Sequence, residues 1–305
     1  MPTDAGHGSP NPCEHGRSFR DYAEHVSGVA WVGGIPWSLY GRVLMPLCMP
    51  HVPVEVERAE LQEAVSRTHA LLACWTTRWD SFDASEWWWT VCDHTDYAVE
   101  NLASSNGRAS IRQGLRHCTA RLIEAEDFAQ LAYPVYKRAA ERYGAHVPTQ
   151  SEHAQNIKRL AEYPGTEFWG AFHDHELAAF ASCRMLDGAV ELISAKSDPN
   201  FHRYEPNATL FYTLAKHYLD LGLGYVSNGS RTLWHPSAIN EFLEKLGFRK
   251  VFCQVNVQLS MAARAMDRVK IARWGSSCGL DSLLGRRWSQ LEGFDKLMRI
   301  ADTFR

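Results

Sequence analysis

Apolar and polar positions follow a regular order between residues 166 and 257. The stretch begins with three short apolar runs separated by turn residues, at 167–173, 176–185 and 188–196. Runs of this length with Asp-His or Asp-Gly between them predict an antiparallel meander of three strands.

After the meander, Pro206 opens a segment whose apolar residues recur at helical spacing until Gly222, which predicts a helix. A strand at 225–227, a helix from Pro236 to Leu246 and a strand at 249–257 follow. This β-β-β-α-β-α-β order predicts an α/β (α+β) fold with a mixed, mainly antiparallel sheet flanked by helices.

The N-terminal half also contains segments with the alternating pattern of a strand and segments with the spacing of a helix, and these segments are shorter. Strands are predicted at 29–32, 38–45, 71–79, 86–93 and 119–123, and helices at 53–69, 102–117, 128–143 and 151–163. The strand at 86–93 holds three consecutive tryptophans. A strand buried between two packed layers accounts for them, and an aromatic wall for a ligand is the alternative.

The last helix of the series carries the phrase Ala238-Ile-Asn-Glu-Phe-Leu-Glu-Lys-Leu-Gly-Phe248. Together with the element order, this phrase resembles the Gcn5-related N-acetyltransferase (GNAT) superfamily, whose last helix commonly ends in Tyr-Glu-Lys-Leu-Gly-Phe. The resemblance implies a sheet whose fourth and fifth strands separate, so that main-chain groups of the fourth strand bind an acyl carbonyl. Leu243 stands where the family often has a tyrosine that protonates the leaving group.

The segment from Arg108 to Gly114 reads Arg-Ala-Ser-Ile-Arg-Gln-Gly and precedes the strand at 119–123. It resembles the Arg-x-x-Ile-Arg-Lys-Gly helix of the Fem-type (FemAB-like) peptidoglycan aminoacyltransferases, which place two GNAT-like lobes side by side. The resemblance implies an abbreviated first lobe at 19–117 and an acyltransferase lobe at 118–260.

Composition is that of a globular protein, with 305 residues, 45% hydrophobic, 22% charged and a net charge of −3. Residues 1–18 are rich in Gly, Pro and His and predict a disordered lead-in. Residues 261–305 hold nine Lys or Arg against five Asp or Glu, a basic C-terminal tail. No apolar run reaches the roughly 18 residues of a membrane helix. Eight cysteines stand singly without a CxxC pair, which predicts reduced thiols in a cytoplasmic protein and no metal site.

The helix at 102–117 is basic along one face. Arg108, Arg112 and Arg116 are spaced four apart, and no acidic residue occurs between 105 and 121. Like charges at this spacing repel, so either acidic side chains elsewhere neutralise them or an anionic partner binds there. We predict that these arginines contact a phosphate-bearing carrier.

Polar side chains follow the two strands that the GNAT resemblance implies should separate. We predict that they bind the substrate in the crevice between the strand ends: Ser194, Lys196, Ser197, Asn228, Ser230 and Arg231. A lysine at a strand end is also common as a solvated residue, so the prediction for Lys196 depends on the crevice.

The loop before Pro206 has no glycine, whereas the GNAT resemblance implies a glycine-rich turn there for the pyrophosphate of acetyl-CoA. Fem-type proteins commonly lack that turn. His202, Arg203 and Asn207 can still offer positive charge and a helix N-terminus to a phosphate, so we predict that Arg203 and Asn207 contact the carrier.

Three residues near the crevice could carry the proton of an attacking amine: His202, Glu205 and His235. Histidine titrates close to neutral pH, which suits proton transfer. Glu205 could instead cap the helix that begins at Pro206.

These features predict an N-acyltransferase that moves an acyl or aminoacyl group from acyl-CoA or an acyl carrier to an amine of a small molecule or peptide, with no tightly bound cofactor. The first alternative is a Fem-like transferase that uses aminoacyl-tRNA and therefore binds tRNA. The second alternative is a non-catalytic binding protein on a degenerate GNAT fold.

Overall fold

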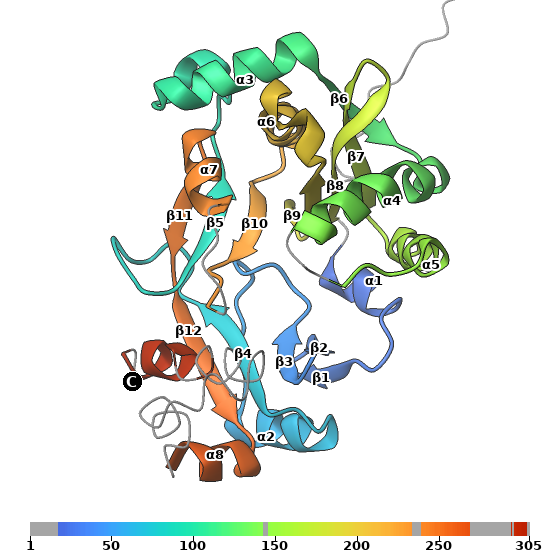
Figure 1. Ribbon diagram of the computed structural model, residues 1–305. Coiled ribbons are helices and arrows are strands. Elements are labelled where there is room, and N and C mark those ends of the chain that lie inside the picture. Colours follow the sequence, from blue (N-terminus) through green and yellow to red (C-terminus); the bar gives the residue numbers. More distant parts are fainter. Residues whose placement is uncertain (1–17, 143–145, 234–238, 269–293, 295, 304–305) are drawn as a thin grey trace, which may run out of the picture.

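Two β-sheets, each flanked by helices, make up the protein (Figure 1). This computed structural model describes residues 18–142, 146–233, 239–268, 294 and 296–303. The first sheet has the order β1-β2-β3-β4-β12, and the second has the order β11-β5-β10-β9-β8-β7-β6. The first sheet contains β1 (Ala30–Val32), β2 (Ile35–Tyr40), β3 (Val43–Pro46), β4 (Leu72–Thr77) and β12 (Gln254–Leu259). The second contains β5 (Trp88–Cys92), β6 (Thr119–Ile123), β7 (Thr166–His173), β8 (Glu176–Leu186), β9 (Ala189–Ser197), β10 (Val226–Ser230) and β11 (Arg249–Phe252).

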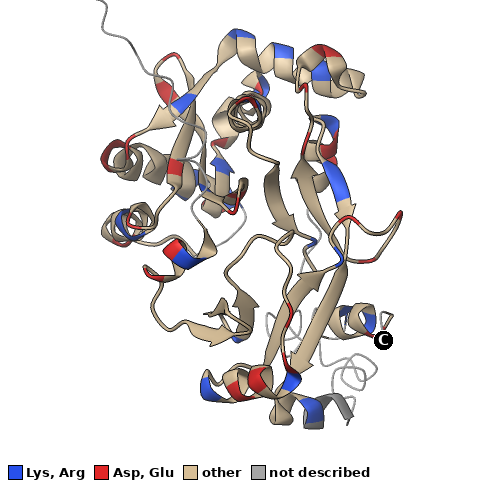
Figure 2. Cartoon of the chain, turned by 180° about the vertical axis from the view of Figure 1, so that it is seen from behind, with Lys and Arg blue, Asp and Glu red and all other residues tan. Residues whose placement is uncertain are grey.

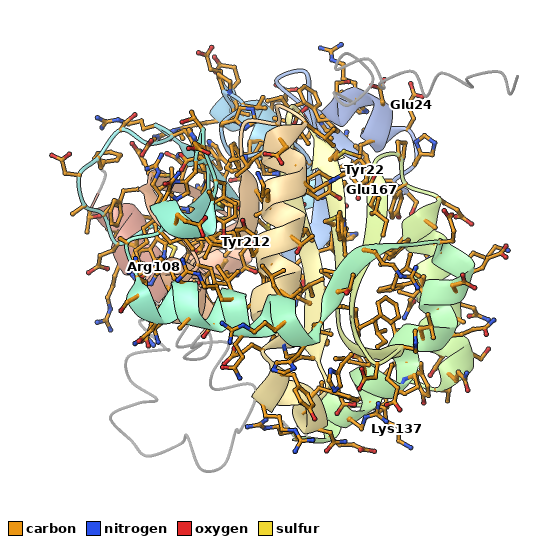
Figure 3. All side chains as sticks on the ribbon, turned by 90° about the horizontal axis from the view of Figure 1, so that it is seen from above. Tyr22, Glu24, Arg108, Lys137, Glu167 and Tyr212 are labelled. Atoms are coloured by element: carbon orange, nitrogen blue, oxygen red, sulfur yellow. The ribbon has the colours of Figure 1, made fainter. Side chains whose placement is uncertain are left out.

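Helices cover both faces of the second sheet. The α-helices are α1 (Phe19–Ala23), α2 (Arg58–Arg67), α3 (Ser105–His117), α4 (Ala125–Arg142), α5 (Gln150–Ala161), α6 (Pro206–Asp220), α7 (Ile239–Lys245) and α8 (Met261–Arg268). The apolar face of α6 buries Leu210, Leu214 and Tyr218 against the sheet, and α3 lies across α6 (Figures 1 and 3). On the opposite face, Phe128 of α4 packs on Phe168 of β7 with ring centroids 4.5 Å apart. The predicted mixed, mainly antiparallel fold is confirmed.

Two predicted strands are wrong in extent. The strand predicted at 38–45 is a hairpin of β2 and β3, because Gly41 adopts the left-handed conformation (φ +63°) between them. The strand predicted at 249–257 is two strands, β11 and β12, which belong to different sheets. They divide at the buried Cys253, whose N–H donates to the carbonyl of Trp87 at 3.0 Å.

The sheets exchange strands between the two halves of the sequence. β5 lies between β10 and β11 of the second sheet, while β12 pairs with β4 of the first. Each predicted lobe, 19–117 and 118–260, therefore contributes a strand to the sheet of the other. The division at 117 stays a prediction about domains, and it does not coincide with the boundary between the sheets.

Asp187, in the turn between β8 and β9, holds two N-terminal segments against the second sheet. Its Oδ1 accepts from the N–H of Phe19 and its Oδ2 from the N–H of Met49, both at 2.9 Å. The turn that begins β9 is thereby fixed to residues more than a hundred positions away.

Two glycines allow α3 to approach its neighbours closely. A Cβ on Gly107 would lie 1.8 Å from the carbonyl oxygen of Lys245, at the end of α7. A Cβ on Gly114 would lie 2.3 Å from Oγ1 of Thr209 in the first turn of α6. Helix packing thus requires the glycine of the Arg-x-x-Ile-Arg-x-Gly segment.

Two predictions from the composition, on membrane helices and on cysteines, can be compared with the described residues. No helix in them combines the length and the apolarity needed to cross a membrane. The six cysteines that they include are free thiols, and five of these are buried.

Candidate functional site

The strands β9 and β10 run parallel and separate after two register positions. Val190 pairs with Val226 and Glu191 with Ser227, and no later pair joins the two strands within the described part of the chain. β10 continues to Ser230 as a partner of β5 instead. The predicted separation is confirmed, and we call the space between the two strands the β9–β10 wedge.

A β-bulge distorts β9 beside the wedge. Ser182 of β8 pairs with Ser194, and Cys183 pairs with Leu192, so Ile193 is an extra residue in β9. Bulges bend a strand and re-aim its main-chain groups, which adds to the divergence from β10.

Main-chain groups of β9 beyond the bulge face the wedge. The N–H of Asp198 donates to the carbonyl of Ala178 in β8 at 2.9 Å. Since hydrogen-bonding direction alternates along a strand, the N–H and C=O groups of Ala195 and Ser197 point away from β8 and toward the wedge. Such fixed donors can bind a carbonyl oxygen and the negative charge that develops on it during acyl transfer.

Lys196 lies partly buried on the side of β9 that faces α4. It pairs in register with Phe180 of the core beneath α4, and its Nζ lies 3.3 Å from the carbonyl oxygen of Ala195. Burial lowers the pKa of the Lys196 ammonium group. No ion pair joins Lys196 to a described residue. Ser194 shares this side of the strand, and contact of either side chain with a substrate stays a prediction.

Ser197, His202 and Asn207 come together at the end of β9. Asn207 Nδ2 donates to Ser197 Oγ at 3.0 Å, and His202 Nε2 lies 3.0 Å from the same oxygen. Arg142 Nη1 lies 3.2 Å from His202 Nδ1. A guanidinium group can only donate, so Nδ1 accepts and the proton of neutral His202 is on Nε2. Ser197 Oγ then accepts two hydrogen bonds and keeps its own proton free to donate.

We expect His202 to be neutral at pH 7 in the folded protein. Burial and the charge of Arg142 lower its pKa below the ordinary 6.5, against an opposing effect of Asp198. Neutral His202 therefore stabilises the fold above pH 6.5, and this contribution is lost as the pH falls through the folded-state pKa. An NMR titration of the imidazole would measure this pKa. Arg142→Gln should raise it, whereas Arg159→Gln on α5 should leave it unchanged, and a wild-type pKa of 6.5 or more would contradict the assignment.

Glu205 adopts the left-handed conformation, with φ 55° and ψ 43°, between the 3-10 helix Pro199–Tyr204 and α6. This conformation strains a residue other than glycine by about 1–2 kcal/mol, and such strain often accompanies function. Glu205 occupies the N-cap position of α6, but its side chain makes no capping hydrogen bond to the helix. Burial raises the pKa of Glu205, which suits a carboxyl group that exchanges protons.

An aromatic patch of His117, His173, Phe201, Arg203 and Tyr204 lies next to Glu205. His173 stacks on Tyr204 with ring centroids 3.8 Å apart, and the guanidinium of Arg203 lies 4.6 Å from the same ring centroid. His117 and Arg203 are exposed. Sequence reasoning found Arg203 but missed the rings, because they come from three separate segments and no periodic pattern links them.

The predicted residues on and just after β10 do not all lie on the same side of that strand. Asn228 and Ser230 lie partly buried on β10, beyond the last pair with β9. Arg231 instead stacks on Trp88, 4.5 Å from the ring centroid, on the β5 side of β10. His235 lies outside the described residues.

The basic face of α3 is partly neutralised within the chain. Arg108 donates to two main-chain carbonyls just ahead of the helix, and Arg112 forms an exposed ion pair of 3.4 Å with Glu100. Arg116 is exposed and has no ion pair with a described residue. Figure 2 shows acidic segments among the basic ones on the helices. Binding of a carrier by this face stays a prediction, and of the three arginines Arg116 is the one with its charge available.

Comparison with known proteins agrees with this geometry. Residues 105–231, from the start of α3 to just beyond β10, match the family model of a GNAT acetyltransferase domain. This stretch contains the wedge, the bulge and the start of α6. The chain therefore carries a GNAT-like acyltransferase fold, as the sequence predicted.

Two solved structures resemble most of the chain. The C-terminal domain of a protein assigned as a lysylphosphatidylglycerol synthetase from Agrobacterium fabrum is 12% identical, with a TM-score of 0.55, and the match covers 85% of this chain and 97% of that chain. FemX is 10% identical, with a TM-score of 0.51, and the match covers 76% of this chain and 88% of that chain. At these identities the likeness shows the fold. No curated protein matches the chain.

Proposed function

We propose that this protein is an N-acyltransferase that holds the carbonyl of an acyl donor in the β9–β10 wedge and transfers the acyl group to an amine. The observation that supports this proposal is that the pairing of β9 with β10 ends at Glu191 and Ser227. Because the strands are unpaired beyond this point, the N–H groups of Ala195 and Ser197 can donate to the carbonyl oxygen of the acyl donor. The match to the acetyltransferase family model supports the same reaction class.

The donor in this proposal is acyl-CoA or an acyl carrier, whose phosphate meets the N-terminus of α6. A helix N-terminus favours anions through its free N–H groups and its dipole. The exposed Arg203 adds positive charge there. The 3-10 helix Pro199–Tyr204 takes the place of a glycine-rich turn, so Asn207 and Arg203 are assigned to the carrier.

The transfer needs one proton to leave the amine and one to reach the carrier. The amine nitrogen attacks the carbonyl carbon, the bond from that carbon to the carrier's sulfur or oxygen breaks, and the carrier leaves as a thiol or an alcohol. We assign proton acceptance to Glu205, because both ring nitrogens of neutral His202 are engaged, Nδ1 with Arg142 and Nε2–H with Ser197 Oγ. Ser194, Lys196 and Asn228 position the acceptor, with Lys196 opposite an anionic group.

Aminoacyl-tRNA is the second candidate donor, and the aromatic patch favours it. Stacked rings beside an arginine are typical of sites for unpaired nucleotides, such as those at the end of a tRNA. The similar structures include FemX and the domain of an assigned lysylphosphatidylglycerol synthetase, which fits aminoacyl transfer.

Thermal unfolding with acetyl-CoA or deacylated tRNA tests both donors. A ligand at a hundredfold excess over its Kd should raise the Tm by about 5 °C, because it stabilises the native state by about 2.7 kcal/mol. Arg203→Glu should weaken the effect, and Arg67→Glu, the same charge change on the distant α2, should not. An effect of acetyl-CoA alone selects the acyl-CoA enzyme, and an effect of tRNA alone selects the tRNA-dependent one. If neither ligand shifts the Tm, the proposal fails and a non-catalytic binding protein becomes the better interpretation.

A further inference from the structure

Lys196 combines partial burial with the lack of a charged partner. Its side chain leaves β9 on the face that α4 covers, in register with Phe180. Within the described part of the chain it forms no ion pair, and its hydrogen bond to the carbonyl oxygen of Ala195 is long, at 3.3 Å. Burial without an opposite charge favours the neutral amine, and it lowers the pKa of Lys196.

The hydrogen bond to Ala195 places the amine of Lys196 at the β9–β10 wedge. The N–H of Asp198 donates to the carbonyl of Ala178 in β8 at 2.9 Å. By alternation, the C=O of Ala195 and the N–H of Ser197 point away from β8 and toward the wedge. Nζ of Lys196 lies beside that C=O group, although its side chain starts on the α4 face. The amine is therefore next to the N–H group assigned to the carbonyl of an acyl donor.

A lysine amine attacks a carbonyl carbon only in its neutral form. At pH 7.4 an ordinary lysine, with a pKa of about 10.4, has about one amine in a thousand neutral. The lowered pKa of Lys196 raises this fraction. The flexible four-carbon stem also lets Nζ turn from the Ala195 carbonyl to a carbon atom held beside it. Amine and acyl carbon held in one site react much faster than the same groups free in solution.

We propose that Lys196 is a self-acylation site, which takes the acyl group when acyl-CoA occupies the wedge and no amine acceptor is bound. The neutral Nζ attacks the carbonyl carbon, the bond from that carbon to the sulfur of CoA breaks, and one proton of the amine passes to the leaving sulfur. The products are an N-acyl-lysine and free CoA as its thiol. This inference rests on the proposed function, with acyl-CoA as the donor.

Self-acylation would regulate the site in which it occurs. The amide on Lys196 carries no charge, so it no longer attracts the anionic group of an acceptor. The attached acyl group also occupies the opening of the wedge. A bound acceptor protects Lys196, because it pairs with the ammonium form and takes the acyl group itself. The modification thus switches the enzyme off when the acceptor is scarce.

The hydroxyl of Ser197 is the rival nucleophile at the wedge. A serine hydroxyl attacks a carbonyl only when a base accepts its proton. Nε2 of His202 carries a proton and donates it to Ser197, while Nδ1 accepts from Arg142, so His202 cannot act as that base. The two products also differ chemically, since hydroxylamine cleaves a serine ester and leaves a lysine amide intact.

Mass spectrometry of the full chain after incubation with acetyl-CoA tests the proposal. We expect Lys196 to be acetylated at least about tenfold faster than Lys158, an exposed lysine on α5. Excess CoA should slow the reaction at Lys196 and not at Lys158, and unfolding in urea should abolish the difference between them. Equal rates at the two lysines in the folded protein would overturn the proposal. So would a hydroxylamine-sensitive acetyl group on Ser197 in place of the amide.

Two variants check the assignment of the site. Lys196→Arg should lose the fast acetylation and Lys158→Arg should keep it. The rates in the wild-type protein need neither variant, so the test stands if Lys196→Arg fails to fold.

The thermal shift with CoA, which carries no acyl group, tells which claim has failed. If CoA raises the Tm and Lys196 is not acetylated, self-acylation is wrong and the acyl-CoA enzyme stands. If CoA leaves the Tm unchanged and Lys196 is not acetylated, acyl-CoA is not the donor and both claims are wrong.

Discussion

Replacing Gly107 with alanine is expected to lower the free energy of unfolding by about 2 kcal/mol. In an exposed helix the same change stabilises by about 1 kcal/mol, because alanine has the higher helix propensity. Here the new Cβ would lie 1.8 Å from the carbonyl oxygen and 2.7 Å from the carbonyl carbon of Lys245. Both atoms are main chain and cannot rotate away, so α3 and α7 must separate. Overpacking of this kind costs about 1–3 kcal/mol or more, which outweighs the gain in propensity.

Urea unfolding would measure the effect as a lower midpoint at an unchanged m-value. Gly224→Ala is the matched control, since its Cβ would meet only the carbonyl oxygen of Gly188 at 3.5 Å, an ordinary contact. That variant should stay within about 0.5 kcal/mol of wild type. A Gly107→Ala protein as stable as wild type, or more stable, would contradict the close packing of α3 on α7.

Asp187→Ala is expected to cost about 3 kcal/mol or more of stability. The carboxylate accepts two main-chain hydrogen bonds, from Phe19 and Met49, and its loss leaves both donors without their partner. Hydrogen bonds to charged groups contribute about 1.5–3 kcal/mol each. The N-terminal segments would separate from the turn that begins β9, so the wedge would also lose its support.

Asp174→Ala is the control that separates the loss of the two hydrogen bonds of Asp187 from the effect of backbone strain. Asp174 also has a positive φ, 45° against 51° for Asp187, but its side chain is 90% exposed. Both alanine variants acquire the same strain, and only Asp187→Ala loses the two hydrogen bonds. Asp187→Asn keeps one acceptor oxygen and tolerates the left-handed conformation, so its stability should be intermediate. Equal losses in both alanine variants, measured by urea unfolding, would contradict the role of Asp187.

Local pattern was sufficient for much of the fold. The meander β7-β8-β9 and helix α6 were predicted to within a residue or two, because their apolar periods and their Asp-His, Asp-Gly and Pro206 boundaries are local signals. The separation of β9 from β10 was predicted through the GNAT resemblance, because the order of the elements before it could be predicted from the sequence. Ser197, His202 and Asn207 were selected because they lie near strand and helix ends in the sequence.

Contacts between segments that lie far apart in the chain were not predicted from the sequence. The partners of Arg108 and Arg112 were not predictable, because a charge pattern along one helix does not tell which carbonyls or carboxylates lie beside it. The rings that stack near Arg203 belong to separate elements for the same reason. The clamp by Asp187 joins residues that only folding brings together.

The sequence by itself determined the type and order of the elements around the wedge, because helix and strand periods and turn residues act over a few positions. Only the tertiary structure decided that β5 enters the second sheet and that β12 leaves for the first. Strand partners are chosen by packing across the whole molecule, and the apolar run at 249–257 fits either sheet equally well.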